Sequence, residues 1–255
     1  MLIAQISDTH IRVPRKNDLD ALERISYFRK CVSDINSLSV IPDAVIHTGD
    51  LTDNGLPDEY CLAKSIHRNL NIPFYPTPGN RDGSKNMINA YAAELTDIID
   101  SNFMIYAIND YPVRLISLDS LASSGPKGDL CKIKLGILDT VLNQVTDKPS
   151  LIFMHHPPFD VSKFGAPVVE YNTPTSINNF YEVLKKYKQI VGIFCGHIHR
   201  SFTKDIYSFK ANVAPPIALD LSHEEPTVCQ KEHQLTYHLH KIQIGSTFKT
   251  VPRYL

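Results

Sequence analysis

No long apolar run, no surplus of one charge and no closely paired cysteines occur in this chain of 255 residues. Its apolar stretches fall well short of the ~20 residues of a membrane span. Its formal net charge is -1, so we expect neither binding of a nucleic acid polymer nor a polybasic membrane patch. The first residues lack the basic region and the extended apolar run of a signal peptide.

The five cysteines are scattered and form no C-x-x-C pair, which indicates neither a disulfide framework nor a zinc knuckle. They lie at Cys31, Cys61, Cys131, Cys195 and Cys229. A reduced, cytoplasmic location is therefore expected. What the chain does contain, 43% hydrophobic and 21% charged residues, is ordinary for a soluble globular protein and is sufficient for one large core.

The first 80 residues alternate between short apolar runs and amphipathic stretches. The apolar runs predict strands over 2–6, 44–47 and 73–77, and apolar residues at spacings of three and four predict helices over 19–38 and 57–70. A β-α-β-α-β order implies parallel strands with crossover helices.

The remainder of the chain continues in a mixed pattern with no internal repeat. Helices are predicted over 85–95, 135–145 and 175–186, a hairpin over 103–108 and 113–118, strands over 151–154 and 190–195, and antiparallel strands over 201–210, 212–219, 235–244 and 247–251. We expect a single domain over 1–255 with an α/β (α+β sandwich) fold, in which two packed mixed β-sheets are flanked by helices. Residues 201–255 would complete the second sheet, with a substrate-side cap as one option.

Five of the predicted strands end in His, Asp or Asn. The residues are Asp8 and His10, Asp50, Asn80, His155, and His197 with His199. Residues two apart in an extended segment point to the same side, which applies to the first and last pairs. Imidazole, carboxylate and amide oxygen suit divalent first-row transition metals, and seven ligands are too many for one tetrahedral zinc. The set therefore predicts two metal ions that share Asp50.

Glycine precedes three of these ligands, in Gly49-Asp50, Gly79-Asn80 and Gly196-His197. Without a Cβ the backbone can turn sharply and leave room for the metals. Each short motif alone carries little information, but five motifs in a fixed order at strand ends are specific.

This order of motifs resembles the signature of the calcineurin-like metallophosphoesterases, most closely their bacterial cyclic-nucleotide and glycerophosphodiester phosphodiesterase branch. The resemblance rests on Asp8-x-His10, Gly49-Asp50, Gly79-Asn80-x-Asp82, His155-His156-Pro157-Pro158 and Gly196-His197-Ile198-His199. It covers residues 1 to about 200 and implies a four-layer fold. It also implies one metal held by Asp8, His10, Asp50 and His199, and another held by Asp50, Asn80, His155 and His197, with iron, manganese or zinc as the ions.

The activity implied is hydrolysis of small phosphodiesters by metal-activated hydroxide. Two ions about 3.5–4 Å apart would bind the phosphate oxygens and lower the pKa of a bound water, and in-line attack of this water on phosphorus is expected. Asp50 would fix the distance between the metals. Asp82 would not contact a metal but would orient one of the metal ligands.

Arg81 departs from the resemblance, because many members of this family place a histidine after the asparagine. Arginine cannot act as a general acid near neutral pH, but its guanidinium can bind a phosphate with two hydrogen bonds. Arg81 is therefore predicted to bind phosphate, and His156 is a candidate proton donor for the leaving group. The stretch Gly79-Asn80-Arg81-Asp82 also resembles the UDP-diacylglucosamine hydrolases of lipid A synthesis.

The other histidines are predicted to be structural. His47 is expected to be a hydrogen-bonded core residue, His67 to be solvated on a polar helix, and His238 with His240 to form one face of a strand. His223 and His233 lie in a loop-like region that could close over the substrate.

Several alternatives stay open at this point. The chain could be a phosphomonoesterase or a nucleotide-sugar-lipid pyrophosphohydrolase of the same superfamily, a nuclease, or a non-catalytic binding module with this fold. The neutral charge argues against the nuclease, and the complete ligand set argues against the binding module. The expected partner is a small phosphodiester, and the sequence is compatible with a homo-oligomer.

Overall fold

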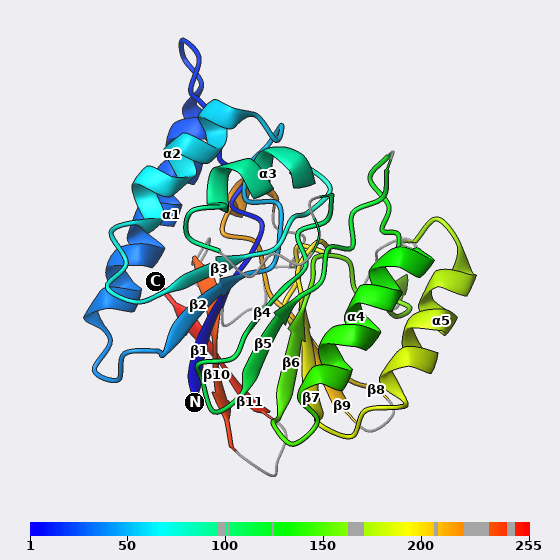
Figure 1. The fold of residues 1–255 in the computed structure, drawn as a ribbon. Coiled ribbons are helices and arrows are strands. Elements are labelled where there is room, and N and C mark those ends of the chain that lie inside the picture. The colour runs from blue at the N-terminus through cyan, green and yellow to red at the C-terminus, as the bar shows by residue number, and fades with distance from the viewer. Residues whose placement is uncertain are drawn as a thin grey trace.

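Two mixed β-sheets packed face to face lie at the centre of the computed structural model (Figure 1). The structure describes residues 1–95, 100, 102–123, 125–162, 171–206, 209–221, 235–243 and 248–255. Cys229, His223 and His233 lie outside these ranges. So do residues 207–208, 222–234 and 244–247 of the segment for which a cap is one option.

The first sheet has five strands in the order β11-β10-β1-β2-β3. These are β1 (Leu2–Ile6), β2 (Ala44–His47), β3 (Phe74–Pro76), β10 (Thr236–Ile242) and β11 (Phe248–Tyr254). The second has six, in the order β4-β5-β6-β7-β9-β8. These are β4 (Tyr106–Ile108), β5 (Arg114–Ser117), β6 (Ser150–Phe153), β7 (Ile190–Cys195), β8 (Phe202–Ile206) and β9 (Phe209–Val213).

Helices cover the outer face of each sheet and complete four layers (Figure 1). The helices α1 (Leu19–Ser37), α2 (Pro57–His67) and α3 (Ser84–Tyr91) lie over the first sheet, and α4 (Lys132–Gln144) and α5 (Pro174–Leu184) over the second. None of the described helices combines the length and the apolar character of a bilayer span. The predicted α/β sandwich is confirmed.

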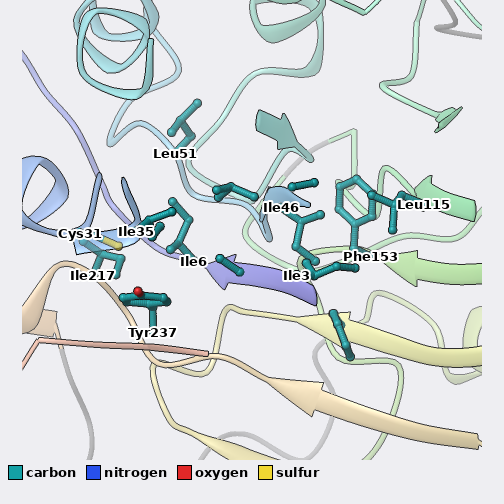
Figure 2. Close-up of a cluster of buried hydrophobic side chains, with 14 of the residues drawn as sticks. Ile3, Ile6, Cys31, Ile35, Ile46, Leu51, Leu115, Phe153, Ile217 and Tyr237 are labelled. Atoms are coloured by element: carbon teal, nitrogen blue, oxygen red, sulfur yellow. The ribbon is translucent and has the colours of Figure 1, made fainter. Parts of the chain in front are cut away.

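The alternation of side chains along β1 shows how the layers pack. Ile3 lies beside Phe153 and Leu115 of the second sheet, whereas Ile6 lies on the side of Cys31 and Ile35 from α1 (Figure 2). All six side chains are fully buried, as expected for a strand enclosed on both faces. Strands β1, β2 and β3 are parallel, as the β-α-β-α-β order predicts, so their carboxyl ends meet at one edge of the sheet.

The C-terminal strands are divided between the two sheets. Strands β8 and β9 extend the second sheet, but β10 pairs antiparallel with β1 and places β11 at the edge of the first sheet. Completion of the second sheet by all of residues 201–255 is therefore wrong. The strand expected over 212–219 ends at Val213, because Pro215 and Pro216 have no N–H for a ladder. The chain crosses there to the first sheet, where Ile217 N donates to Ser7 O (2.9 Å).

His67 is buried, so its predicted solvation is wrong. Its ring stacks on Phe74 with centroids 4.0 Å apart and planes at 10°, and its Nε2 lies 2.9 Å from the hydroxyl of Tyr91. Phe74 and Tyr91 come from β3 and α3, so the polar neighbours of His67 in α2 gave no signal of this contact.

The other structural histidines lie as predicted. His47 is buried and hydrogen-bonded, with Nδ1 accepting from Gly49 N (3.2 Å). His238 and His240 share the face of β10 that lies between the sheets, where His238 contacts Asn212 of β9 (2.7 Å) and His240 contacts Gln5 of β1 (2.9 Å).

The buried, neutral side chain of His67 is expected to make the fold less stable in acid. Burial lowers the pKa of His67 to about 4, whereas the unfolded side chain titrates near 6.5. Between these values the unfolded state binds the extra proton, so stability falls as pH falls. His67→Phe keeps the stacked ring and removes the titration. We expect the free energy of unfolding to fall between pH 7 and pH 5 by roughly 2 kcal/mol less in this variant than in the wild type. Urea denaturation at both pH values measures it, and equal pH dependence in the two proteins would contradict the assignment.

Candidate metal centre

The carboxyl ends of β1, β2, β3, β6 and β7 meet at one edge of the sandwich, and all seven predicted ligands lie there. Ligand atoms of Asp8, His10 and His199 lie within 4.8 Å of one another, as do those of Asp8, Asp50 and His155. Asn80 joins the second group, since its Oδ1 is 3.0 Å from His155 Nε2. His197 joins there as well, with Nδ1 3.1 Å from His155 Nε2.

The backbone at these strand ends is left-handed. Among the described residues, six residues other than glycine have a positive φ, and five of them are candidate ligands. They are Asp8, His10, Asp50, His197 and His199, with φ between 45° and 73°. The prediction that Asp8-x-His10 and His197-x-His199 use an extended segment is therefore wrong. Each pair converges through two left-handed residues, a conformation that costs of order 1–3 kcal/mol per residue and concentrates at functional sites.

Three histidines aim Nε2 at the cluster, because each Nδ1 donates a proton to an oxygen behind it. His10 Nδ1 donates to Asp53 Oδ1 (3.3 Å), His155 Nδ1 to Thr48 O (2.8 Å) and His199 Nδ1 to Leu221 O (2.8 Å). Such outer partners fix the tautomer and the orientation of metal-binding histidines.

These Nε2 atoms face carboxylate oxygens. His10 Nε2 is 3.6 Å from Asp50 Oδ2, and His155 Nε2 is 3.5 Å from the same oxygen. His199 Nε2 is 3.3 Å from Asp8 Oδ1. In the part of the chain that is described, His10 Nε2 and Asp8 Oδ1 are buried without a hydrogen-bond partner. Carboxylates and histidine nitrogens that converge in this way attract cations, so the donor set fits divalent metals.

The pKa shifts within the cluster in the metal-free protein agree with a site for divalent metals. Burial raises the pKa of Asp50 to about 7, and the charge of Asp8 contributes to the rise. Burial also disfavours the charged form of His199, but the carboxylate of Asp8 outweighs it and the pKa of His199 is raised. Burial lowers the pKa of His155 to about 3. The cluster thus attracts positive charge at Asp50 and His199, and metal binding would displace those protons.

The three glycines make room for neighbouring ligands. A Cβ at Gly49 would lie 2.4 Å from His155 Nδ1, one at Gly79 would lie 2.3 Å from Asp50 Oδ1, and one at Gly196 would lie 2.6 Å from Asp8 Oδ2. Of these three glycines, only Gly49 has a positive φ, of 96°. The missing Cβ atoms were expected to leave room for the metals. Their direct effect is to let the side chains of neighbouring candidate ligands lie close together.

Asp82 lies behind the ligands, with its carboxylate buried among donors. Its oxygens accept from the backbone N–H groups of Leu51, Thr52 and Gly79, each at 3.0 Å, and from the hydroxyl of Tyr60 at 3.1 Å. Burial raises the pKa of Asp82, and these hydrogen bonds oppose the rise. Its contacts tie the loop after Asp50 to the loop that carries Asn80.

Arg81 and His156 occupy contrasting environments. Arg81 is exposed, and its backbone N–H donates to Asp50 Oδ1 (2.7 Å), so its side chain starts beside the carboxylate of Asp50. His156 is fully buried, with Nδ1 2.9 Å from Ser120 Oγ and Nε2 3.0 Å from Pro126 O. Burial holds the pKa of His156 well below its usual range. Because both ring nitrogens are engaged and the ring is neutral, the geometry does not support His156 as the proton donor.

Several residues that contact the side chains of this site from behind were not identified from the sequence. Asp53 could have been found, since it follows Asp50 by three residues in the same loop. Ser120, which bonds His156, follows β5 and gave no signal. Arg24 and Asp220 form an ion pair across 196 positions of sequence, which no local pattern indicates.

Comparisons with known proteins agree with this geometry. The family model described as calcineurin-like phosphoesterase matches residues 1–201. A probable glycerophosphodiester phosphodiesterase GpdQ of Arcobacter nitrofigilis is 35% identical, over 87% of this chain and 81% of the relative. A 3',5'-cyclic-nucleotide phosphodiesterase of Nostoc sp. is 24% identical, over 97% of this chain and 90% of the relative.

A solved structure shares the fold. The crystal structure of a dimetal phosphatase from Danio rerio superposes with a TM-score of 0.68. The two chains are 14% identical, and the match covers 99% of this chain and 95% of that one.

Proposed function

The chain belongs to the calcineurin-like phosphoesterase family, and we propose that it uses two divalent metal ions to hydrolyse small phosphodiesters of the glycerophosphodiester or cyclic-nucleotide type. The relatives are named for these two substrate classes. The scattered cysteines favour a cytoplasmic location for this activity.

The observation that carries this proposal is the convergence of histidine Nε2 atoms on two buried carboxylates. Asp50 lies between His10 and His155, with Oδ2 at 3.6 Å and 3.5 Å from their Nε2 atoms. One group then comprises Asp8, His10, Asp50 and His199, and the other Asp50, Asn80, His155 and His197. Iron, manganese and zinc all suit this donor set.

The metals would supply Lewis acidity and a water of lowered pKa at the phosphate. The chain's own residues do the positioning. Asp82 fixes the loops that carry Asp50 and Asn80, and Thr48 O fixes the ring of His155. Arg81 binds a non-bridging phosphate oxygen and stabilises the charge that develops on it.

Hydrolysis of a small substrate panel tests the proposal. The protein is stripped of metal with a chelator, reloaded with manganese, zinc or iron, and assayed on cyclic AMP, a glycerophosphodiester, and aryl mono- and diesters. We expect no activity without metal and faster hydrolysis of diesters than of monoesters. Preference for the monoester would favour a phosphomonoesterase, and metal-independent turnover would contradict the dinuclear centre.

Arg81→His is expected to change the response to the leaving group. An alkyl leaving group needs a proton whereas an activated aryl group does not, and a histidine here could supply it. We expect kcat/KM for an alkyl diester to rise relative to the aryl diester by about tenfold or more. Arg81→Ala is the control, since it removes the guanidinium without adding an acid and should lower both values together, by about 10–100-fold. An unchanged ratio of the two kcat/KM values in Arg81→His would contradict the inference that hydrolysis of the alkyl diester is limited by a missing proton donor at position 81.

A further inference from the structure

One buried arginine joins two carboxylates behind the candidate metal centre. Arg24 lies on α1 and is 5% exposed. Its Nη2 donates to Asp220 Oδ2 at 2.6 Å, and its Nε lies 3.2 Å from both oxygens of that carboxylate. Its Nη1 lies 3.4 Å from Asp53 Oδ1. A single guanidinium therefore spans a carboxylate after β2 and another near the C-terminal part of the chain.

The first carboxylate supports His10. Asp53 Oδ1 accepts from His10 Nδ1 (3.3 Å), and Arg24 Nη1 also reaches the backbone oxygen of His10 at 3.5 Å. Arg24 thus contacts both the main chain of this ligand and the carboxylate that orients its ring.

The second carboxylate supports His199. Asp220 is the middle residue of a short 3-10 helix, η2 (Leu219–Leu221), which packs on α1. The next residue, Leu221, supplies the oxygen that accepts from His199 Nδ1 (2.8 Å). The ion pair of Arg24 with Asp220 therefore anchors the segment that orients this ring.

We propose that Arg24 is a positioning residue for one of the two metal sites, the site of Asp8, His10, Asp50 and His199. This inference rests on the proposed dinuclear centre and adds to it a support that reaches both histidines of one site. The other site does not use it, since His155 is oriented by Thr48 O. The planar fork of arginine suits this role, because it holds two carboxylates at fixed angles, which a lysine ammonium cannot do.

The test is metal binding by the full-length chain. Metal-free wild type, Arg24→Gln and Arg12→Gln are titrated with manganese by calorimetry. Arg12 is the matched control, because its Nη1 also binds Asp53 (Oδ2, 3.1 Å) but its other carboxylate contacts are with Asp18 and Asp20. We expect two ions in the wild type, one of them weakened about 10–100-fold in Arg24→Gln, and both within threefold of wild type in Arg12→Gln.

Asp220→Asn breaks the same link at a side chain that is 27% exposed, so it covers the case in which Arg24→Gln does not fold. It is expected to weaken the same single ion. Combining either variant with Asn80→Ala, which removes a ligand of the other site, should abolish tight binding of both ions.

The outcomes separate this inference from the proposed function. A wild type that binds fewer than two ions contradicts the dinuclear centre itself. A wild type with two ions, together with Arg24→Gln and Asp220→Asn in which both affinities are unchanged or fall equally, contradicts the positioning role alone.

Discussion

Asp50→Ala is expected to lower metal-dependent phosphodiester hydrolysis at least about a hundredfold, equivalent to about 2.7 kcal/mol of transition-state stabilisation. Asp50 Oδ2 lies between His10 Nε2 and His155 Nε2, so its loss removes an anionic ligand from both proposed sites. Steady-state kinetics on the best diester of the panel, with the metal content of each protein measured in parallel, checks this result. A variant that keeps two tightly bound ions and more than a few per cent of wild-type turnover would contradict the shared role of Asp50.

Stability of the metal-free protein is the control for this variant. Burial raises the pKa of Asp50 to about 7, which means that the charged carboxylate lowers the free energy of unfolding of the metal-free protein. We therefore expect metal-free Asp50→Ala to unfold at the same denaturant concentration as metal-free wild type, or at a higher one. Lost activity with retained stability locates the defect in the site, as expected when a buried charge is kept for function.

The placement of the ligands could be predicted because strand ends carry a simple signal. Asp8, Asp50 and His155 each follow a short apolar run closely, and buried parallel strands bring such positions to one edge. Two adjacent sheets then place five such ends together. The assignment of the family and the choice of candidate metal ligands needed only these local patterns and their order.

The remaining features depend on contacts between distant segments. The left-handed backbone at Asp8 and His10 is imposed by pairing with the loop after β2, where Asp8 N donates to Gly49 O and His10 N to Asp50 O, both at 3.0 Å. The ion pair of Arg24 with Asp220 and the stacking of His67 likewise join elements that the sequence separates. No periodicity or motif encodes such pairs, so this part of the outer support was not predictable from the sequence, whereas Asp82 was indicated by its place in the Gly79-Asn80-x-Asp82 motif.

Several costs are concentrated at this edge of the sheets. Left-handed candidate ligands, buried carboxylates and the unpartnered Nε2 of His10 each destabilise the metal-free fold, and bound ions would relieve all three. The metals would then stabilise the folded chain as well as supply the chemistry. Close backbone approach between the ligand loops is what makes this arrangement possible, and Gly79 is where it can be tested.

Gly79→Ala is expected to lower activity by about a hundredfold, since the added Cβ would lie 2.3 Å from both the backbone N and the Oδ1 of Asp50. Backbone cannot move aside as a flexible side chain can, so either Asp50 or the loop that carries Asn80 must shift. Overpacking of this kind costs about 1–3 kcal/mol of stability as well. Enzyme kinetics and manganese titration of the same sample measure the two effects at the site.

Gly83→Ala is the matched control in the same loop. A Cβ there would have no neighbour closer than 3.7 Å, and Gly83 is the N-cap of α3, where alanine costs about 1 kcal/mol or less relative to glycine. We expect its activity and its affinity for both ions to stay within about threefold of wild type, because its contacts do not reach Asp50. If Gly79→Ala retained wild-type kinetics, or if Gly83→Ala lost as much activity, the close approach of Gly79 to Asp50 would not be what positions Asp50 and Asn80 for the metals.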